Sequence, residues 1–292
     1  MRTFLLTAVA VLTMAASASN AGILSRAAKP APTVSDAAVA EIQRAIDEQR
    51  LLDAGRYLDE TQLAGVKDAR LLMLGGDLNL ARGRYNAALA SYRAAEGDVG
   101  VRARALQGQG VALSLLGRSA EAMITLQRAV AEDPKAWRAW NALGREYDNR
   151  TQWAEAGAAY EQALSASGGA ALVYNNRGYS RLLQNRRDEA VADLVAALQK
   201  RPDLVEARTN LRLALALRGD YDRAVAGGTP DDQAALLNNA GFAAGMRGDY
   251  AKAEDLLGRA LTLKSEYYGR ASENLKVVRA LAAQKPAPNV DP

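Results

Sequence analysis

A period of 34 residues runs through most of the chain and restricts its fold more than any other feature. Glycine recurs at this interval at Gly76, Gly110, Gly144 and Gly178, and alanine recurs in two further columns. The alanine columns alone could arise by chance in a chain this rich in alanine, whereas the glycine column could not easily do so. A fixed period of this length indicates an array of stacked units rather than one globular core.

The best copy of the repeat begins at Trp137 and predicts a pair of helices. Its diagnostic positions are Trp140, Leu143, Gly144, Tyr147, Ala156, Tyr160 and Ala163. They match the signature of the tetratricopeptide repeat, a helix–turn–helix unit. Trp140, Leu143 and Tyr147 follow helical spacing and predict one apolar stripe. Gly144 is small, which predicts that the paired helices approach closely there.

Turn residues mark the junction between the two helices of each unit. A left-handed residue is expected at Gly83, Gly117, Asn185, Gly219 and Gly248, because glycine and asparagine adopt that conformation most readily. Asp220 and Asp249 follow two of these glycines and are predicted to cap the second helix of their units.

The predicted architecture is therefore an all-α tetratricopeptide-repeat superhelical solenoid of antiparallel helix pairs over 35–283. Its predicted parts are a degenerate helix pair over 36–66, repeats over 69–102, 103–136, 137–170, 171–204, 205–233 and 234–267, and a capping helix over 268–283. A proline-rich tail over 284–292 is expected to be disordered.

The fifth repeat is irregular, since only 29 residues separate Ala224 from the equivalent Ala253. Gly227 and Gly228 are predicted to cut its second helix short, and Thr229 followed by Pro230 predicts the start of the next helix. One interpretation is a harmless deletion in a loop. The other is a local change of superhelix curvature that shapes a binding groove.

The N-terminus predicts export. A basic Arg2, an apolar run over 4–14 and small residues before a cut site are typical of a secretory signal peptide over 1–21, followed by a flexible leader over 22–34. The alternative is an uncleaved membrane anchor, for which the apolar run is short. The expected location is the periplasm, with secretion as the less favoured outcome.

Two residue types are absent from the chain and narrow its chemistry. Without cysteine there is no disulfide, thiolate metal site or acylated lipoprotein anchor. Without histidine there is no Ser-His-Asp arrangement. The 37 basic and 33 acidic residues nearly balance, so no nucleic-acid footprint is indicated. We expect a non-catalytic protein that needs no cofactor and no metal, and an enzyme built on a carboxylate pair is the remaining alternative.

In this repeat family the first helices line the concave surface, which holds peptides or partner helices. The residues expected on that surface to bind a partner are Asn141, Arg145, Asn175, Tyr179, Leu183, Leu213, Leu217, Asn238, Phe242 and Met246. This surface begins polar and ends apolar, so amides can bind peptide backbone and the apolar end suits an amphipathic helix. The alternative is that the apolar residues pack on each other or under the final helix.

A second candidate site is the cluster of Arg177, Arg181, Arg186 and Arg187. Four guanidinium groups could receive an acidic segment of a partner. The alternative is that their stems pack along the helix surface and their charged ends lie in water.

The C-terminal half resembles a known family. Its resemblance lies in 174–179 (YNNRGY), 210–219 (NLRLALALRG), 238–242 (NNAGF), 247–250 (RGDY) and 271–275 (ASENL). These segments resemble TadD-type proteins of the tight-adherence (Flp) pilus assembly system of Gram-negative bacteria. The resemblance implies a periplasmic accessory that contacts envelope proteins such as pilus or secretin components. Members are commonly lipoproteins, whereas this chain has no cysteine to acylate. The alternative function is a general periplasmic envelope-assembly or chaperone-like adaptor.

Overall fold

The computed structural model describes residues 33–263 and 269–284, and within these ranges it is built of helices without any strand. The predicted signal peptide, nearly all of the leader and most of the predicted tail lie outside the described residues. The helices are α1 (Asp36–Asp47), α2 (Leu51–Leu63), α3 (Ala69–Ala81), α4 (Tyr85–Ala95), α5 (Arg102–Leu115), α6 (Ser119–Glu132), α7 (Trp137–Asn149), α8 (Trp153–Ser167), α9 (Ala171–Leu183), α10 (Arg187–Lys200), α11 (Val205–Arg218), α12 (Tyr221–Val225), α13 (Pro230–Met246), α14 (Tyr250–Leu263) and α15 (Gly269–Ala283).

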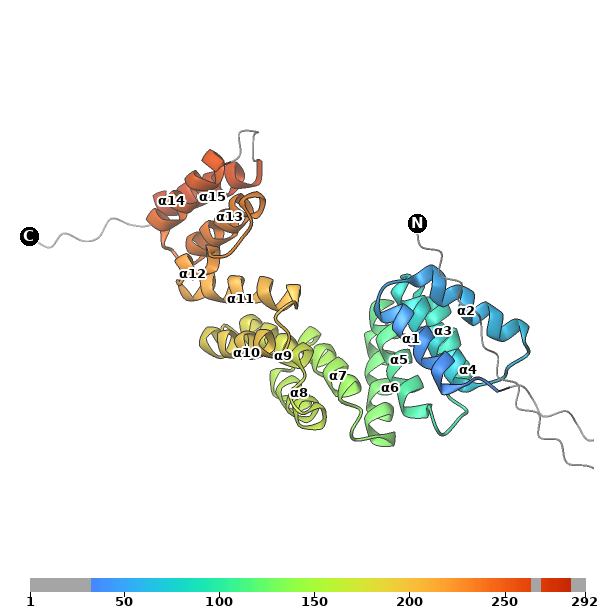
Figure 1. Ribbon diagram of the computed structural model, residues 1–292. Coiled ribbons are helices and arrows are strands. Elements are labelled where there is room, and N and C mark those ends of the chain that lie inside the picture. The colour runs from blue at the N-terminus through green and yellow to red at the C-terminus, as the bar shows by residue number, and fades with distance from the viewer. Residues whose placement is uncertain (1–32, 264–268, 285–292) are drawn as a thin grey trace, which may run out of the picture.

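These helices form consecutive antiparallel pairs, which confirms the predicted all-α solenoid. Figure 1 shows an elongated, curved array, with α1 to α6 at one end and α13 to α15 at the other. The odd-numbered helices are the first helices of the pairs, and each contacts the first helix of the following pair. The face formed by these first helices is therefore continuous along the array.

The glycine column marks where the two helices of a pair touch. A Cβ atom on Gly144 would lie 2.6 Å from the Cε1 atom of Tyr160 and would clash with it. The same close approach joins each glycine of the column to a side chain 16 residues later: Gly76 to Tyr92, Gly110 to Leu126, Gly178 to Leu194 and Gly241 to Leu257. The prediction of close approach at Gly144 is confirmed.

The turns inside the pairs are left-handed, as predicted at the four turn glycines and at Asn185. Gln49 and Thr151 also adopt positive φ, and both occupy the same place in the 34-residue frame. The predicted cap at Asp220 is wrong, because its side chain makes no cap hydrogen bond. Its carboxylate instead pairs with Arg218 at 2.9 Å and Arg223 at 3.0 Å.

The fifth pair has a second helix, α12, of only five residues. The residues that this repeat lacks relative to the 34-residue period are therefore missing from its second helix and not from a loop. Arg212 stands where the other units have the contact glycine, and its Nη2 donates to the carbonyls of Ala226 at 3.3 Å and Gly227 at 3.1 Å. The next helix, α13, begins at Pro230 after the cap Thr229, as predicted from these two residues, and so starts ahead of the repeat boundary at 234. The Thr229 side chain accepts from the Asp232 N–H.

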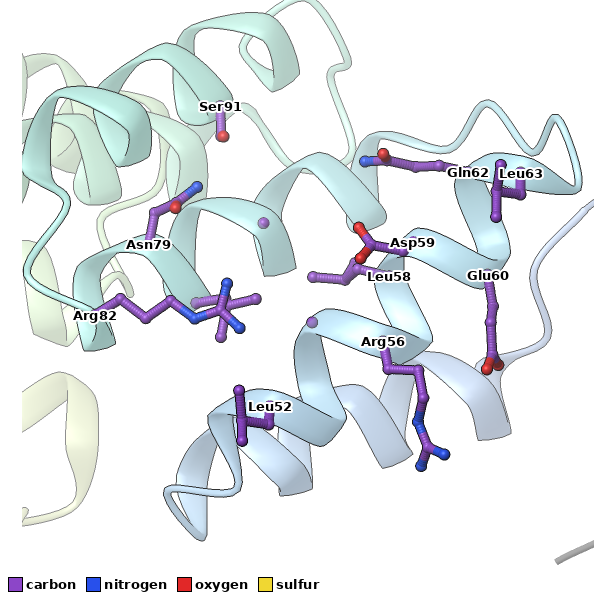
Figure 2. Close-up of a pocket in the computed structure, with 13 residues that line it drawn as sticks. Leu52, Arg56, Leu58, Asp59, Glu60, Gln62, Leu63, Asn79, Arg82 and Ser91 are labelled. Atoms are coloured by element: carbon purple, nitrogen blue, oxygen red, sulfur yellow. The ribbon is translucent and has the colours of Figure 1, made fainter.

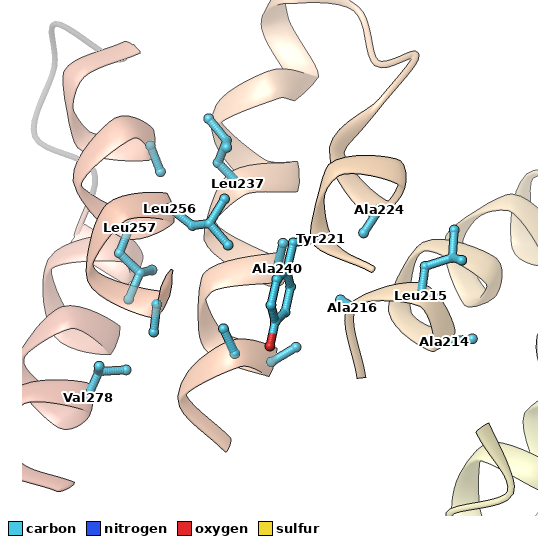
Figure 3. Packing of buried hydrophobic residues seen from close by; sticks show 14 of the residues in the cluster. Ala214, Leu215, Ala216, Tyr221, Ala224, Leu237, Ala240, Leu256, Leu257 and Val278 are labelled. Atoms are coloured by element: carbon cyan, nitrogen blue, oxygen red, sulfur yellow. The ribbon is translucent and has the colours of Figure 1, made fainter. Parts of the chain in front are cut away.

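The largest apolar core lies around this irregular unit and extends from α10 to α15 (Figure 3). Tyr221 of the short helix is buried in it, beside Leu237 and Ala240 of α13. The Tyr221 hydroxyl donates to the Asp249 carboxylate, which joins α12 to the turn before α14. The shortened helix therefore leaves the packing continuous.

Candidate protein-binding face

The face of the first helices carries a row of exposed apolar side chains. Tyr179, Leu183, Leu213, Phe242 and Met246 are between 39% and 63% exposed and are called the apolar strip below. They come from α9, α11 and α13. Leu217, also predicted to bind a partner, is half-buried and packs against the C-terminal core. The final helix α15 does not cover the strip, since the side chains remain exposed in its presence.

The asparagines predicted to be exposed on this face are buried, which corrects the sequence analysis. Asn141, Asn175 and Asn238 are each at most 7% exposed. Their amides bond to other asparagines of the chain. Asn210 donates to Asn175 at 3.0 Å, Asn175 donates to Asn176 at 3.1 Å, and Asn176 donates to Asn141 at 3.0 Å. This amide chain connects α11, α9 and α7 in one direction.

A second, shorter amide chain lies at the C-terminal end. Asn274 of α15 donates to Asn238 at 2.9 Å, and Asn238 donates to Asn239 at 3.2 Å. No amide bond joins α11 to α13 among the described residues, because Thr209 stands at the asparagine position of α11. Its hydroxyl donates to the Val205 carbonyl of its own helix at 3.0 Å. The polar network is thus interrupted beside the short helix α12.

A pocket of about 470 Å³ opens on this face where α7, α9 and α11 meet. Its lining residues are Arg145, Asn175, Asn176, Tyr179, Val205, Glu206, Thr209 and Asn210. The structure brings together three residues predicted to bind a partner, Arg145, Asn175 and Tyr179. Sequence reasoning missed Asn176, Val205, Glu206 and Asn210. Asn176 directly follows Asn175 of the predicted face, which was the available signal.

The arginine cluster already has acidic partners within the chain. Arg177 makes two bonds to the buried Asp193, at 2.9 and 2.7 Å, and Arg181 reaches the same carboxylate at 2.7 Å. Arg186 pairs with Glu189 at 2.6 Å and holds the pKa of that carboxyl below its ordinary value. Arg187 makes no ion pair with a described residue. An acidic partner would have to compete with Asp193 and Glu189 for three of the four guanidinium groups.

Two carboxylates of α7 are shielded from water and receive only neutral donors. Glu146 is buried and accepts from the hydroxyls of Ser114 and Ser119. Asp148 accepts from the Tyr160 hydroxyl at 2.7 Å and from the Ser180 hydroxyl at 2.6 Å. Burial raises the pKa of the Asp148 carboxyl, and the two hydroxyl bonds offset that effect only in part. Both carboxylates join neighbouring repeats.

Another pocket, of about 610 Å³, lies between α2, α3 and α4 (Figure 2). Leu58 points from α2 towards α3, whereas Arg56 and Glu60 point away from it. Leu52 and Leu63 at its rim are almost fully exposed. Arg82 occupies one end, donating to the Leu51 carbonyl at 2.7 Å.

The described residues contain no group of three or more acidic, histidine or cysteine side chains placed to hold a metal ion. None of their helices has the length and hydropathy needed to cross a membrane.

Similar solved structures share the fold of this chain. A chain of the APC/C hetero-tetramer Cut9–Hcn1 superposes with a TM-score of 0.65 at 13% identity over 83% of this chain, which spans about half (49%) of that chain. A tetratricopeptide repeat protein of Parabacteroides merdae gives 0.51 at 16% identity, covering 84% of this chain and 98% of the other. The C-terminal part of a Cytophaga hutchinsonii repeat protein gives 0.54 at 14% identity, covering 81% and 99%. The chain is an all-α tetratricopeptide-repeat solenoid.

No protein-family model and no curated protein sequence matches this chain. At these identities the similar structures establish the fold, and the function has to be argued from the chain's own residues.

Proposed function

We propose that this chain is a protein-binding scaffold that holds a segment of a partner protein along the face of its first helices. The observation that carries the proposal is the apolar strip. Its side chains are exposed although Leu215 and Leu237, on the same helices α11 and α13, are buried. Exposed aromatic and aliphatic side chains on neighbouring helices provide the anchors that dominate protein interfaces.

The strip and the pocket form one surface, because Tyr179 belongs to both. A partner segment that crosses α9, α11 and α13 would bury Leu213, Phe242 and Met246 together. An amphipathic helix presents apolar side chains on one side in this way and is the partner structure that the strip fits best.

The proposed place of action is the periplasm, as part of tight-adherence pilus or secretion machinery. The apolar run and small residues of 1–21 support export, and the five C-terminal segments that resemble TadD-type proteins support the pilus role. A general envelope-assembly adaptor is the competing outcome. Purification of the tagged mature chain from the envelope of its own bacterium separates them, since recovered secretin or pilus subunits favour the first and a broad set of unfolded envelope proteins favours the second.

Paired measurements of stability and affinity test the binding surface. Tyr179→Ala and Phe242→Ala should each weaken binding of the recovered partner by about 2 kcal/mol, as expected for aromatic anchors. Their melting temperatures should stay near the wild-type value because neither side chain is part of a buried core. Ile124→Ala on α6, which removes an even more exposed apolar side chain outside the strip, is the control. Undiminished affinity in both folded variants would exclude this surface.

A further inference from the structure

We infer that the pocket between α7, α9 and α11 selects its partner by the order of charges, and this inference rests on the proposed function. A bound segment places an acidic side chain on Arg145 and a basic side chain on Glu206. Its apolar side chains follow on the strip. The order along the segment is therefore acidic, basic, apolar.

Both charges of the pocket are free to meet a ligand. The Arg145 guanidinium makes no ion pair or hydrogen bond with a described residue, although its charge acts on the Asp148 carboxyl. Glu206 has no ion-pair partner among the described residues either. It is exposed in the first turn of α11. Other arginines on the array, such as Arg177 and Arg118, are paired within the chain.

Between these charges the pocket is neutral. Its floor consists of Asn175, Asn176 and Asn210, whose amides bond to one another in a fixed direction. The Thr209 hydroxyl is engaged by its own helix. Discrimination between ligands of opposite charge order then depends on Arg145 and Glu206.

The spacing of the charges follows from the helices that carry them. Arg145 lies on α7 and Glu206 on α11, with α9 between them. Packed helices lie roughly 8–10 Å apart, and an extended chain advances about 3.3 Å per residue. The stretch of the ligand that crosses the pocket, ahead of the helical part on the strip, is extended, so its acidic and basic residues should be about five to six positions apart.

The strip fixes the order. It starts at Tyr179 in the pocket and continues over α11 to Phe242 and Met246 on α13. Glu206 shares α11 with Leu213 and this helix contacts α13, whereas Arg145 lies on α7, on the other side of α9. A ligand with the two charges exchanged would bring its base to Arg145 and its acid to Glu206, two repulsive contacts in place of two attractive ones.

The experiment uses four fluorescent peptides and the full mature chain. Two peptides carry Asp, then Lys five positions on, then a Leu-Phe-Leu anchor, written in both chain directions. Two matched peptides exchange Asp and Lys. Anisotropy should show that wild type binds the better peptide of the first pair about tenfold more tightly than either exchanged peptide, with a preference that shrinks in high salt. The double variant Arg145→Glu/Glu206→Arg should prefer the exchanged pair.

The control is Arg150→Glu/Glu155→Arg, which makes the same charge changes on exposed residues outside the pocket and should retain the wild-type preference. Equal binding of all four peptides by wild type, still weakened by Phe242→Ala, would overturn the charge inference and leave the proposed function standing. A preference unchanged in the Arg145/Glu206 double variant would overturn it as well. Failure of wild type to bind any of the peptides would count against both.

Discussion

At the scale of single residues, the fold depends on contacts between a glycine and one large side chain. Tyr160 lies against the backbone of α7 at Gly144, and its hydroxyl reaches Asp148 on the same helix. Gly144 and Tyr160 therefore depend on each other, because the ring fits only where the helix carries no Cβ atom. The repeat signature predicted both residues, but it did not predict the hydroxyl bond or its extension to Ser180 of the next pair.

Two glycine-to-alanine changes in one helix pair should act in opposite directions. Gly144→Ala places a Cβ against the Tyr160 ring and should lower the free energy of unfolding by about 1–3 kcal/mol. Gly157→Ala in α8 meets open space and should raise it by roughly 0.5–1 kcal/mol, the ordinary gain in a helix interior. Urea denaturation of both variants measures the difference, and equal effects would show that the ring does not limit the site.

The pH dependence of stability should reveal Asp148. Its pKa is raised in the fold by burial, so the folded chain holds this proton more tightly than the unfolded chain. Ionisation at pH 7 therefore destabilises the fold, and this effect disappears as the pH falls through the raised pKa towards the ordinary value of 3.8. The stability of Asp148→Asn relative to wild type should be highest at pH 7 and decline on acidification.

Glu121 provides the opposite case for comparison. Arg118 lowers the pKa of its carboxyl, so Glu121 stabilises the fold above its ordinary pKa and loses that effect in acid. The stability of Glu121→Gln relative to wild type should rise on acidification. Relative stabilities of the two variants that change with pH in the same direction would contradict the assigned environments.

At the scale of elements, the Arg212 side chain fills the space left by the shortened second helix, α12, and binds its end. Arg212 occupies the glycine position of α11, and 16 residues on, where the other units have the large side chain, stands Gly228. The guanidinium bonds to the carbonyls at the end of α12. The sequence predicted the short helix because Gly227, Gly228 and Thr229 are direct local signals. It did not predict the role of Arg212, which depends on a backbone that the shortening itself brings into reach.

Removing the Arg212 guanidinium should loosen α12 more than the rest of the array. Arg212→Met keeps the apolar stem but leaves two carbonyls without their donor, which should lower stability by about 1 kcal/mol and accelerate amide hydrogen exchange in 221–228. Arg223→Met in the same helix removes a largely exposed ion pair and should change stability by less than about 0.5 kcal/mol. Unchanged exchange in 221–228 would mean that the core alone holds α12 in place.

At the scale of the whole molecule, the array has several apolar cores of unequal size. The C-terminal core joins α10 to α15, whereas the buried apolar residues shared by α8 and α9 form a small cluster around Tyr160 and Val173. The 34-residue period predicted the order of the helices because each pair repeats the same local contacts. The pocket was not predictable, since it arises where three pairs meet and no single repeat contains it.

Unfolding should begin outside the C-terminal core. In a repeat array each unit is stabilised mainly by its neighbours, so local opening follows the size of the local core. Hydrogen exchange of the native chain should be slower for the central amides of α13 and α14 than for those of α8 and α9. Equal protection of these four helices would indicate that the array unfolds as one cooperative body.

The asparagine bonds and the largest apolar core stabilise partly different boundaries between neighbouring helix pairs. The amide chain stops between α11 and α13, where the largest apolar core crosses from one helix to the other. Where the apolar clusters are small, around α8 and α9, the amide chain runs unbroken from α7 to α11. The amide chain and the largest core overlap at the boundary between the α9–α10 pair and α11, which is crossed both by the Asn210–Asn175 bond and by the core. A force that bends the molecule must therefore break polar bonds at one place or separate apolar surfaces at another.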